Sequence, residues 1–191
     1  MANSKGILFI VSAPSGTGKT TIVRRILKEF PEIVFSISAT TRKKRHNEKD
    51  GVDYLFLTED EFRNKIEAGE FAEWEKFYDY YYGTFRDYID KNLQKGSSVL
   101  LEIDVKGALK LKECYPDAVL IFIVPPSFDE LVSRLKNRQT EDEIDLKKRI
   151  ERAELELRLK DKFDYFIHNV EIEKAVSDVK SLIENIIKEN K

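Results

Sequence analysis

The sequence predicts an α/β fold in which a parallel sheet is flanked by helices. Three runs, at residues 7–11, 99–101 and 119–124, are apolar throughout and lack the alternation of a half-exposed strand. Strands that are covered on both faces have this pattern, and they are typical of parallel sheets. A segment with helical periodicity follows each run, so strands and helices alternate along the chain.

The helices and the last strand follow from local signals. The apolar stripe of an amphipathic helix recurs in residues 19–30, 105–113 and 175–186. After two prolines, Ser127 and Glu130 match a capping box, which predicts that another helix begins there. A shorter apolar segment at 165–167 predicts one more strand.

Two regions interrupt the alternation. Residues 36–88 are polar, aromatic and turn-rich, with a short helix that Thr58 and Glu61 signal and that ends near Gly69. Residues 134–160 are almost continuously charged, which favours a helical flap over a core element. We therefore expect one domain over 1–191, with a core made of 1–35, 89–133 and 161–191, an inserted lobe at 36–88 and a lid at 134–160.

The composition argues against several classes of protein. Charged residues make up 36% of the 191, but 33 Lys and Arg nearly balance 35 Asp and Glu, for a net charge of -2. A nucleic-acid or membrane binder needs a positive face, so neither partner is expected. Cys114 is the single cysteine, and no apolar run approaches the ~20 residues that span a bilayer. The expectation is a soluble, cytoplasmic protein.

The segment after the first apolar run has the pattern of a phosphate-binding loop. SAPSGTGKT, residues 12–20, has two glycines in the turn and ends in Gly-Lys-Thr. Backbone N–H groups of such a strand-to-helix turn converge on phosphate oxygens, while Lys19 reaches the transferring phosphates and Thr20 offers its hydroxyl to Mg²⁺. Ala13 replaces the first glycine of G-x-x-x-x-G-K-[ST]. The alternative is a plain glycine-rich turn before a helix.

The inserted lobe carries a basic run that suits a phosphate monoester. Arg42 and Arg45 lie three residues apart in SATTRKKRHNE. Two planar guanidinium groups, helped by phenol hydroxyls, hold a dianion firmly, and Tyr54 and Tyr82 are candidate phenols. A solvated basic patch or a nucleic-acid contact is the alternative for RKKRH.

The same lobe carries a carboxylate and hydroxyl groups among aromatic side chains. FAEW supplies Glu73, and YYYGT supplies hydroxyls. Guanine presents N1–H and N2–H donors beside the O6 acceptor, so one carboxylate accepts from both nitrogens while a hydroxyl donates to O6. Adenine has an acceptor at N1 and leaves Glu73 unpaired. Such a site rejects the wrong base by on the order of 10⁴-fold.

Five stretches together resemble the guanylate kinases. SAPSGTGKT, SATTRKKRHNEKDGVDY, FAEW, YYYGT and LLEID occur in the order and at about the spacings of that family, over nearly the whole chain. The family also accepts alanine at the first loop position. The resemblance implies a P-loop kinase that converts ATP and GMP into ADP and GDP, with Mg²⁺ as the metal. A monomer or homodimer is expected.

The resemblance also implies a role for each matching residue. The residues that bind GMP are Ser38, Arg42, Arg45, Tyr54, Glu73, Tyr82, Gly83, Thr84 and Glu102. The residues that bind ATP are Ala13, Pro14, Ser15, Gly16, Thr17, Gly18, Lys19, Thr20, Thr21 and Asn169. The metal site comprises Thr20 and, through water, Asp104. For Asp104, the alternative is a helix N-cap.

Arginines of the charged lid suit phosphoryl transfer. That reaction depends on alignment and on neutralising the charge of the moving group. Arg134 and Arg138 lie four residues apart, and Arg149 eleven further on, all at helical spacing. The resemblance implies that they contact the ATP phosphates and form the catalytic set with Lys19 and Arg42. An exposed, ion-paired helix is the alternative.

Two other functions remain open at this point. A P-loop kinase with another small acceptor needs Lys19 and the lid but not Ser38 or Glu73. A peptide-binding module, similar to the kinase-like domain of membrane-associated guanylate kinase scaffolds, is not catalytic. Those modules tend to have a degraded ATP loop, whereas this chain keeps Lys19 and Thr20.

Overall fold

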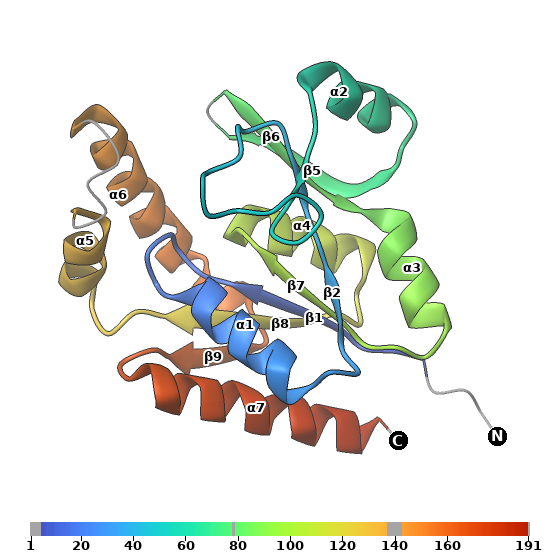
Figure 1. The fold of residues 1–191 in the computed structure, drawn as a ribbon. Coiled ribbons are helices and arrows are strands. Elements are labelled where there is room, and N and C mark those ends of the chain that lie inside the picture. The colour runs from blue at the N-terminus through green and yellow to red at the C-terminus, as the bar shows by residue number, and fades with distance from the viewer. Residues whose placement is uncertain (1–4, 78, 137–142, 191) are drawn as a thin grey trace.

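A five-stranded parallel sheet lies at the centre of the computed structural model, which describes residues 5–77, 79–136 and 143–190 (Figure 1). The order of strands is β2-β7-β1-β8-β9, and each neighbouring pair is parallel. The bounds are β1 (Leu8–Ser12), β2 (Val34–Ser36), β7 (Val99–Ile103), β8 (Val119–Val124) and β9 (Tyr165–His168). The predicted parallel sheet is confirmed, and the sequence missed only the short β2 among its strands.

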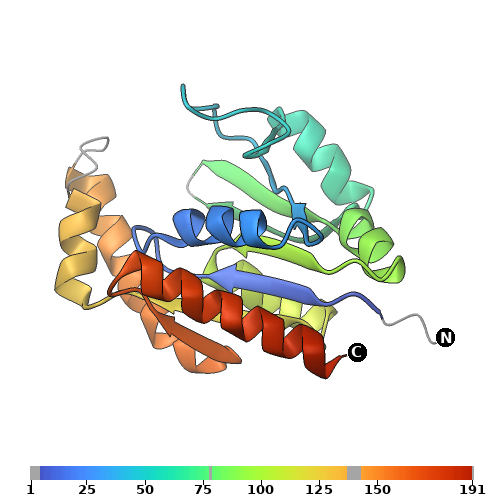
Figure 2. The ribbon, with the colours of Figure 1, turned by 60° about the horizontal axis from the view of Figure 1, so that its bottom comes forward.

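Helices cover both faces of this sheet, as the all-apolar strands predict. Phe9 and Val11 of β1 pack with α1 (Lys19–Glu29) and α7 (Ile172–Glu189), which run side by side (Figures 1 and 2). Leu8 and Ile10 face the other way, toward α3 (Arg86–Gln94) and α4 (Val105–Cys114). The alternate sides of a single strand therefore belong to two separate cores.

A second, smaller sheet forms within the inserted region, above the central sheet in Figure 1. Its order is β4-β3-β6-β5, with bounds β3 (Ala39–Thr40), β4 (Leu55–Phe56), β5 (Phe71–Phe77) and β6 (Tyr80–Phe85). Thr58 and Glu61 make the predicted capping box of α2 (Glu59–Glu67). This sheet has a core of its own around Phe62. Ser36 still belongs to β2, and α3 already begins at Arg86, inside the predicted lobe bounds of 36–88.

Two further helices, α5 (Phe128–Lys136) and α6 (Glu143–Arg158), pack against each other through Leu131, Leu135 and Ala153. The Ser127 hydroxyl accepts the N–H of Glu130 at 3.1 Å, so the predicted cap of α5 is present. A 3-10 turn, η1 (Lys160–Lys162), leads from α6 toward β9. Arg138 lies outside the described residues. In the described ranges, no helix has the length and apolar character needed to cross a membrane.

Candidate active site

A cleft of about 500 Å³ brings most of the predicted site residues together. It lies between the loop after β1, the carboxyl end of β7, the small sheet and α6. Its lining contains residues 13–21 with Ser38, Arg42, Arg45, Tyr54, Glu73, Tyr82, Gly83, Glu102, Asp104 and Arg149. Three predicted residues, Thr84, Arg134 and Asn169, are not among the residues that line it.

The loop after β1 has the strained backbone that its glycines permit. Gly16 and Gly18 both have φ of 91°, a conformation that residues with a Cβ rarely adopt. The Thr17 hydroxyl donates to the Pro14 carbonyl at 2.7 Å, and Asn169 Nδ2 donates to the Thr17 carbonyl at 2.6 Å. Asn169 is buried behind this loop, so here it supports the loop rather than facing the cleft.

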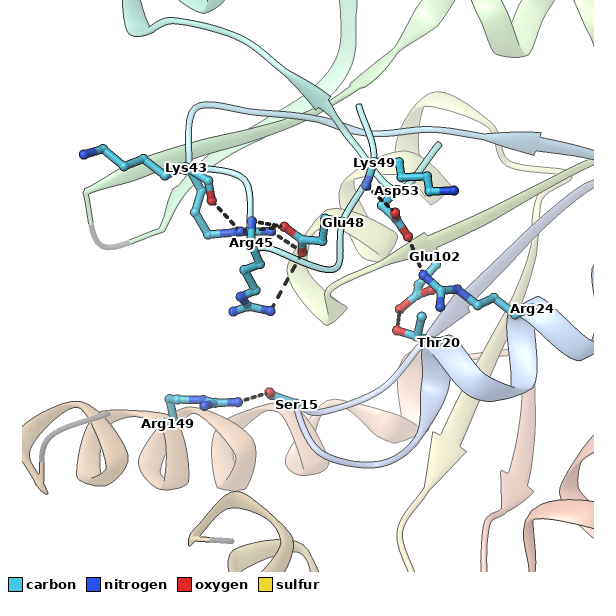
Figure 3. Close-up of polar contacts among 11 residues, drawn as sticks. Ser15, Thr20, Arg24, Lys43, Arg45, Glu48, Lys49, Asp53, Glu102 and Arg149 are labelled. Atoms are coloured by element: carbon cyan, nitrogen blue, oxygen red, sulfur yellow. Dashed lines mark hydrogen bonds and ion pairs between the residues drawn. The ribbon is translucent and has the colours of Figure 1, made fainter. Parts of the chain in front are cut away.

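The carboxyl end of β7 receives the polar side chains that follow the loop. Lys19 Nζ donates to the Ile103 carbonyl at 2.8 Å and lies 3.9 Å from Glu102. The Thr20 hydroxyl donates to the same Glu102 carboxylate (Figure 3). Asp104 follows and caps α4, because its Oδ1 accepts the N–H groups of the second and third residues after it at 2.9 and 3.0 Å. The capping alternative for Asp104 is therefore realised in the structure.

The two arginines of the lobe converge on one carboxylate. Glu48 accepts from both terminal nitrogens of Arg42, at 2.8 and 3.0 Å. It also accepts the Arg45 backbone N–H at 2.8 Å (Figure 3). Although burial opposes it, these hydrogen bonds keep the pKa of Glu48 below its usual value. Sequence reasoning missed Glu48, although an acid three residues after Arg45 was a visible signal.

Two phenols stand beside Arg42. Its guanidinium lies 5.4 Å from the centre of the Tyr54 ring, and the Tyr54 and Tyr82 rings meet edge to face at 6.3 Å. Burial raises the pKa of Tyr54 to about 12, and the Glu102 carboxylate adds to this effect. Tyr54 is therefore a neutral hydrogen-bond donor over the whole working pH range.

Glu73 occupies a buried position on β5, facing the cleft. Its Oε1 accepts the Thr84 hydroxyl of β6 at 2.8 Å, and both side chains are almost completely buried. Burial raises the pKa of Glu73 to about 7; the Thr84 hydrogen bond opposes this shift and the Asp104 charge reinforces it. Among the described residues, no group donates a hydrogen bond to its other carboxylate oxygen, Oε2.

Helices α5 and α6 also contact the loop after β1. Arg149 of α6 donates to the Ser15 hydroxyl at 2.5 Å (Figure 3). On α5, Leu131 and Leu135 press against Gly16, where an added Cβ would lie 3.1 Å from Leu135. Arg134 of α5 instead makes an i,i+4 ion pair with Glu130 at 2.9 Å.

Comparison with known proteins decides the family of this chain. A model of the family described as guanylate kinase matches residues 5–186. The chain belongs to the guanylate kinase family. It is 45% identical to the guanylate kinase of Thermotoga maritima over 94% of this chain and 86% of that protein, and 48% identical to that of Chlorobium luteolum over 95% and 93%. The crystal structure of the Anaplasma phagocytophilum guanylate kinase superposes with a TM-score of 0.79 at 32% identity, covering 95% of this chain and 86% of that one.

Family membership confirms the predicted activity. Guanylate kinases are ATP:GMP phosphotransferases, so this chain is an enzyme that transfers a phosphoryl group between these nucleotides. The predicted α/β fold agrees with the solved relative.

The cleft of this guanylate kinase also contains residues that sequence reasoning did not single out. Phe77, Tyr80, Ile103, Arg152 and Glu156 complete the lining. Arg152 was visible as an arginine three residues after Arg149, and Glu156 as its i,i+4 partner on the same helix face. Neither signal is specific, because charged i,i+4 pairs are ordinary on exposed helices.

Proposed function

We propose that GMP binds in the inserted lobe, residues 36–88, and that ATP binds on the loop at residues 13–21. In this proposal residues 134–160 form a lid over ATP. The core that carries both is made of residues 1–35, 89–133 and 161–191. The observation that carries this proposal is the buried Glu73, which lines the same cleft as Lys19 and accepts a hydrogen bond from Thr84 behind it. A buried carboxylate is costly unless a ligand uses it, and guanine offers two adjacent N–H donors.

On the GMP side, the base and the phosphate are recognised by separate groups. Glu73 accepts from guanine N1–H and N2–H. The other residues of the proposed base site are Ser38, Gly83, Thr84 and Glu102. The phosphate is held by Arg42, Arg45, Tyr54 and Tyr82. The Glu48 contacts support this assignment, because together with a hydrogen bond from Nη1 to the Lys43 carbonyl at 2.7 Å they fix the Arg42 guanidinium in place before the ligand binds.

On the ATP side, the loop N–H groups bind the phosphates and Lys19 neutralises them. Arg149 adds a second positive charge beside the ATP phosphates. Its hydrogen bond to Ser15 of the loop supports this placement. Arg134 and Arg138 complete the catalytic set in this proposal. Asn169 serves the ATP site by supporting the loop at Thr17.

The residues near Thr20 fit a magnesium ion that is bound mainly by substrate and water. A hydroxyl and carboxylate oxygens, from Thr20, Glu102 and Asp104, are the hard ligands that Mg²⁺ prefers, and the described residues contain no group of three His, Cys, Asp or Glu that could cage a metal alone. Mg²⁺ would hold phosphate oxygens in place and draw off their charge. Thr20 would contact it directly and Asp104 through water.

The chemistry requires positioning more than proton transfer. The GMP phosphate oxygen is already an anion at neutral pH, so no general base is needed. Arg42 and Arg45 hold this anion against its repulsion from ATP, and Lys19 and Arg149 stabilise the charge on the phosphoryl group in transit. The lobe and the lid exclude water, which would otherwise hydrolyse ATP.

The test is ADP formation from Mg·ATP with each of AMP, GMP, UMP and CMP, for the wild type and for Glu73→Gln. We expect turnover with GMP alone, and a fall in kcat/KM for GMP of roughly 100-fold in the variant, because the amide turns a donor toward the guanine donors. Glu59→Gln is the matched control, since this exposed glutamate pairs only with Arg63 among the described contacts. Comparable rates with several monophosphates, or an unchanged Glu73→Gln enzyme, would contradict the base assignment.

A cytoplasmic location and a monomer or homodimer remain part of the proposal. The first is checked by cell fractionation and the second by light scattering over a range of concentrations. Neither outcome alters the assignment of the cleft.

A further inference from the structure

Arg152 of α6 lies where three parts of the molecule meet. Its Nε donates to Glu156 of the same helix at 2.7 Å, its Nη2 lies 3.4 Å from Asp104 at the end of β7, and its guanidinium carbon lies 3.8 Å from the centre of the Phe77 ring on β5. The Arg152 side chain is only 21% exposed. One guanidinium group therefore joins the lid helix, the core and the lobe.

The contact between α6, the end of β7 and β5 forms a junction that depends on the positive charge of Arg152. Burial alone would lower the pKa of Arg152, but the carboxylates of Glu156, Asp104 and Glu75 together raise it. Glu156 is almost fully buried, and Glu75 has a buried oxygen without a hydrogen-bond donor among the described residues. Without a cation in their midst, these carboxylates would repel one another and separate the parts that carry them.

The contact with Phe77 connects this junction to the GMP side. Phe77 and Glu75 lie on β5, four and two residues after Glu73, so their side chains share the cleft-facing side of that strand. A guanidinium over an aromatic face is attracted to it, more strongly when both are partly buried. A shift of β5 on GMP binding would therefore be transmitted to α6 through this contact.

The same helix leads directly to the ATP side. Arg149 lies three residues before Arg152 in α6, on the same side of the helix, and contacts Ser15 of the loop. A helix is stiff over one turn, so fixing Arg152 also fixes Arg149.

We propose that Arg152 is a positioning residue that couples the lobe to the lid helix, so that GMP and ATP bind with positive cooperativity. This inference rests on the proposed placement of GMP and ATP. Binding of GMP settles Phe77 against Arg152, which aligns Arg149 for the ATP phosphates. By linkage, ATP raises the affinity for GMP by the same factor.

The experiment measures that factor by calorimetry. The Kd of GMP is determined with and without a saturating, non-hydrolysable ATP analogue with a β,γ-methylene bridge and Mg²⁺, and the Kd of the analogue with and without GMP. In the wild type we expect each ligand to tighten the other by about 5-fold or more, the lower end of ordinary coupling. In Arg152→Gln and in Phe77→Leu, we expect the factor to fall to within about 2-fold of unity.

The variants separate coupling from a structural role. A variant that only loses stability should have a lower melting temperature and weaker binding of both ligands. Its coupling factor, which is the Kd of one ligand without the other divided by its Kd with the other, should not change. Arg152→Lys keeps the positive charge over Phe77 but loses the fork that reaches Glu156 and Asp104, so it should keep part of the coupling. Arg158→Gln, on the same helix but exposed and paired with Glu154, should keep all of it. Phe77→Leu keeps the test decisive if Arg152→Gln does not fold.

The outcomes also separate the role of Arg152 from the placement of GMP. Wild-type ligand affinities with an unchanged coupling factor in Arg152→Gln and Phe77→Leu would overturn the role of Arg152 alone. A wild-type GMP affinity that does not respond to Glu73→Gln would overturn the placement of GMP, and the coupling with it.

Discussion

Glu73 shows how burial adjusts a single group to its task. Its pKa of about 7 follows mainly from burial on β5, so in the free enzyme it exchanges its proton near neutral pH. In the proposed site, only the ionised carboxylate can accept from both guanine N–H groups. Guanine binding should therefore favour the carboxylate, and it should release about half a proton per site at pH 7.

The affinity for the base should then depend on pH with a definite sign. Below pH 7 Glu73 becomes protonated, and the Kd of the ligand should rise toward about 10-fold per pH unit, whereas above pH 7.5 it should be flat. Calorimetry with guanosine between pH 5.5 and 8.5 checks this. Guanosine replaces GMP because the GMP phosphate itself titrates near pH 6. The same pH response in Glu73→Gln would assign it to another group.

At the scale of one element, Asp104 caps the start of α4, and the proposed function gives it a second role. Its Oδ1 accepts the helix N–H groups, and in the proposed metal site its other carboxylate oxygen would contact the waters of the metal. Asn is as good an N-cap as Asp, whereas Ala is not.

Two variants of Asp104 separate these roles. Asp104→Asn should keep the melting temperature within a degree or two of the wild type, while the Mg²⁺ concentration needed for half-maximal activity rises several-fold. Asp104→Ala should show the same Mg²⁺ effect and also lose about 1 kcal/mol of stability. Thermal melts and Mg²⁺ titrations of activity measure the two effects. A wild-type Mg²⁺ requirement in Asp104→Asn would remove Asp104 from the metal site and leave it with the helix cap and the contact with Arg152.

Local sequence patterns predicted the main strands of the central sheet but not the strands of the small sheet, and the difference has a physical reason. The runs at 7–11, 99–101 and 119–124 were recognisable because strands buried on both faces must be apolar at every position. Two strands of the small sheet, β3 and β4, escaped notice because they are two residues long and owe their conformation to their neighbours. Pairing between distant segments, rather than local preference, makes them strands.

At the scale of the whole molecule, the hydrophobic cores are separate, and this determines how the protein responds to a substitution in one of them. The lobe core packs Ala39, Phe62, Phe71 and Tyr81 together, with Phe62 and Phe71 stacked at 4.4 Å. The central sheet has its own cores on each face. The lobe should therefore open locally without unfolding the loop that binds ATP.

Substitution at Phe62 tests this independence. Phe62→Ala removes a fully buried ring, at a cost of about 3–5 kcal/mol within the lobe. We expect GMP binding to be lost while the affinity for the ATP analogue alone stays within about 3-fold. Calorimetry measures both, and hydrogen exchange should show lost protection confined to 37–85. Parallel loss of both ligands would mean that lobe and core unfold as one unit.

The sequence by itself determined the family and the main strands of the central sheet, and it predicted the phosphate-binding loop. These depend on local spacing: a glycine-rich turn between an apolar strand and a helix needs no knowledge of the rest of the chain. Only the tertiary structure decided that Glu48 orients Arg42, that Asn169 supports the loop and that Arg152 joins three parts. Asn169 and Thr17 are 152 positions apart, and α6 meets β5 only after the chain has folded. The physical reason is that burial and charge pairing are set by neighbours in space, while local patterns record only neighbours in sequence.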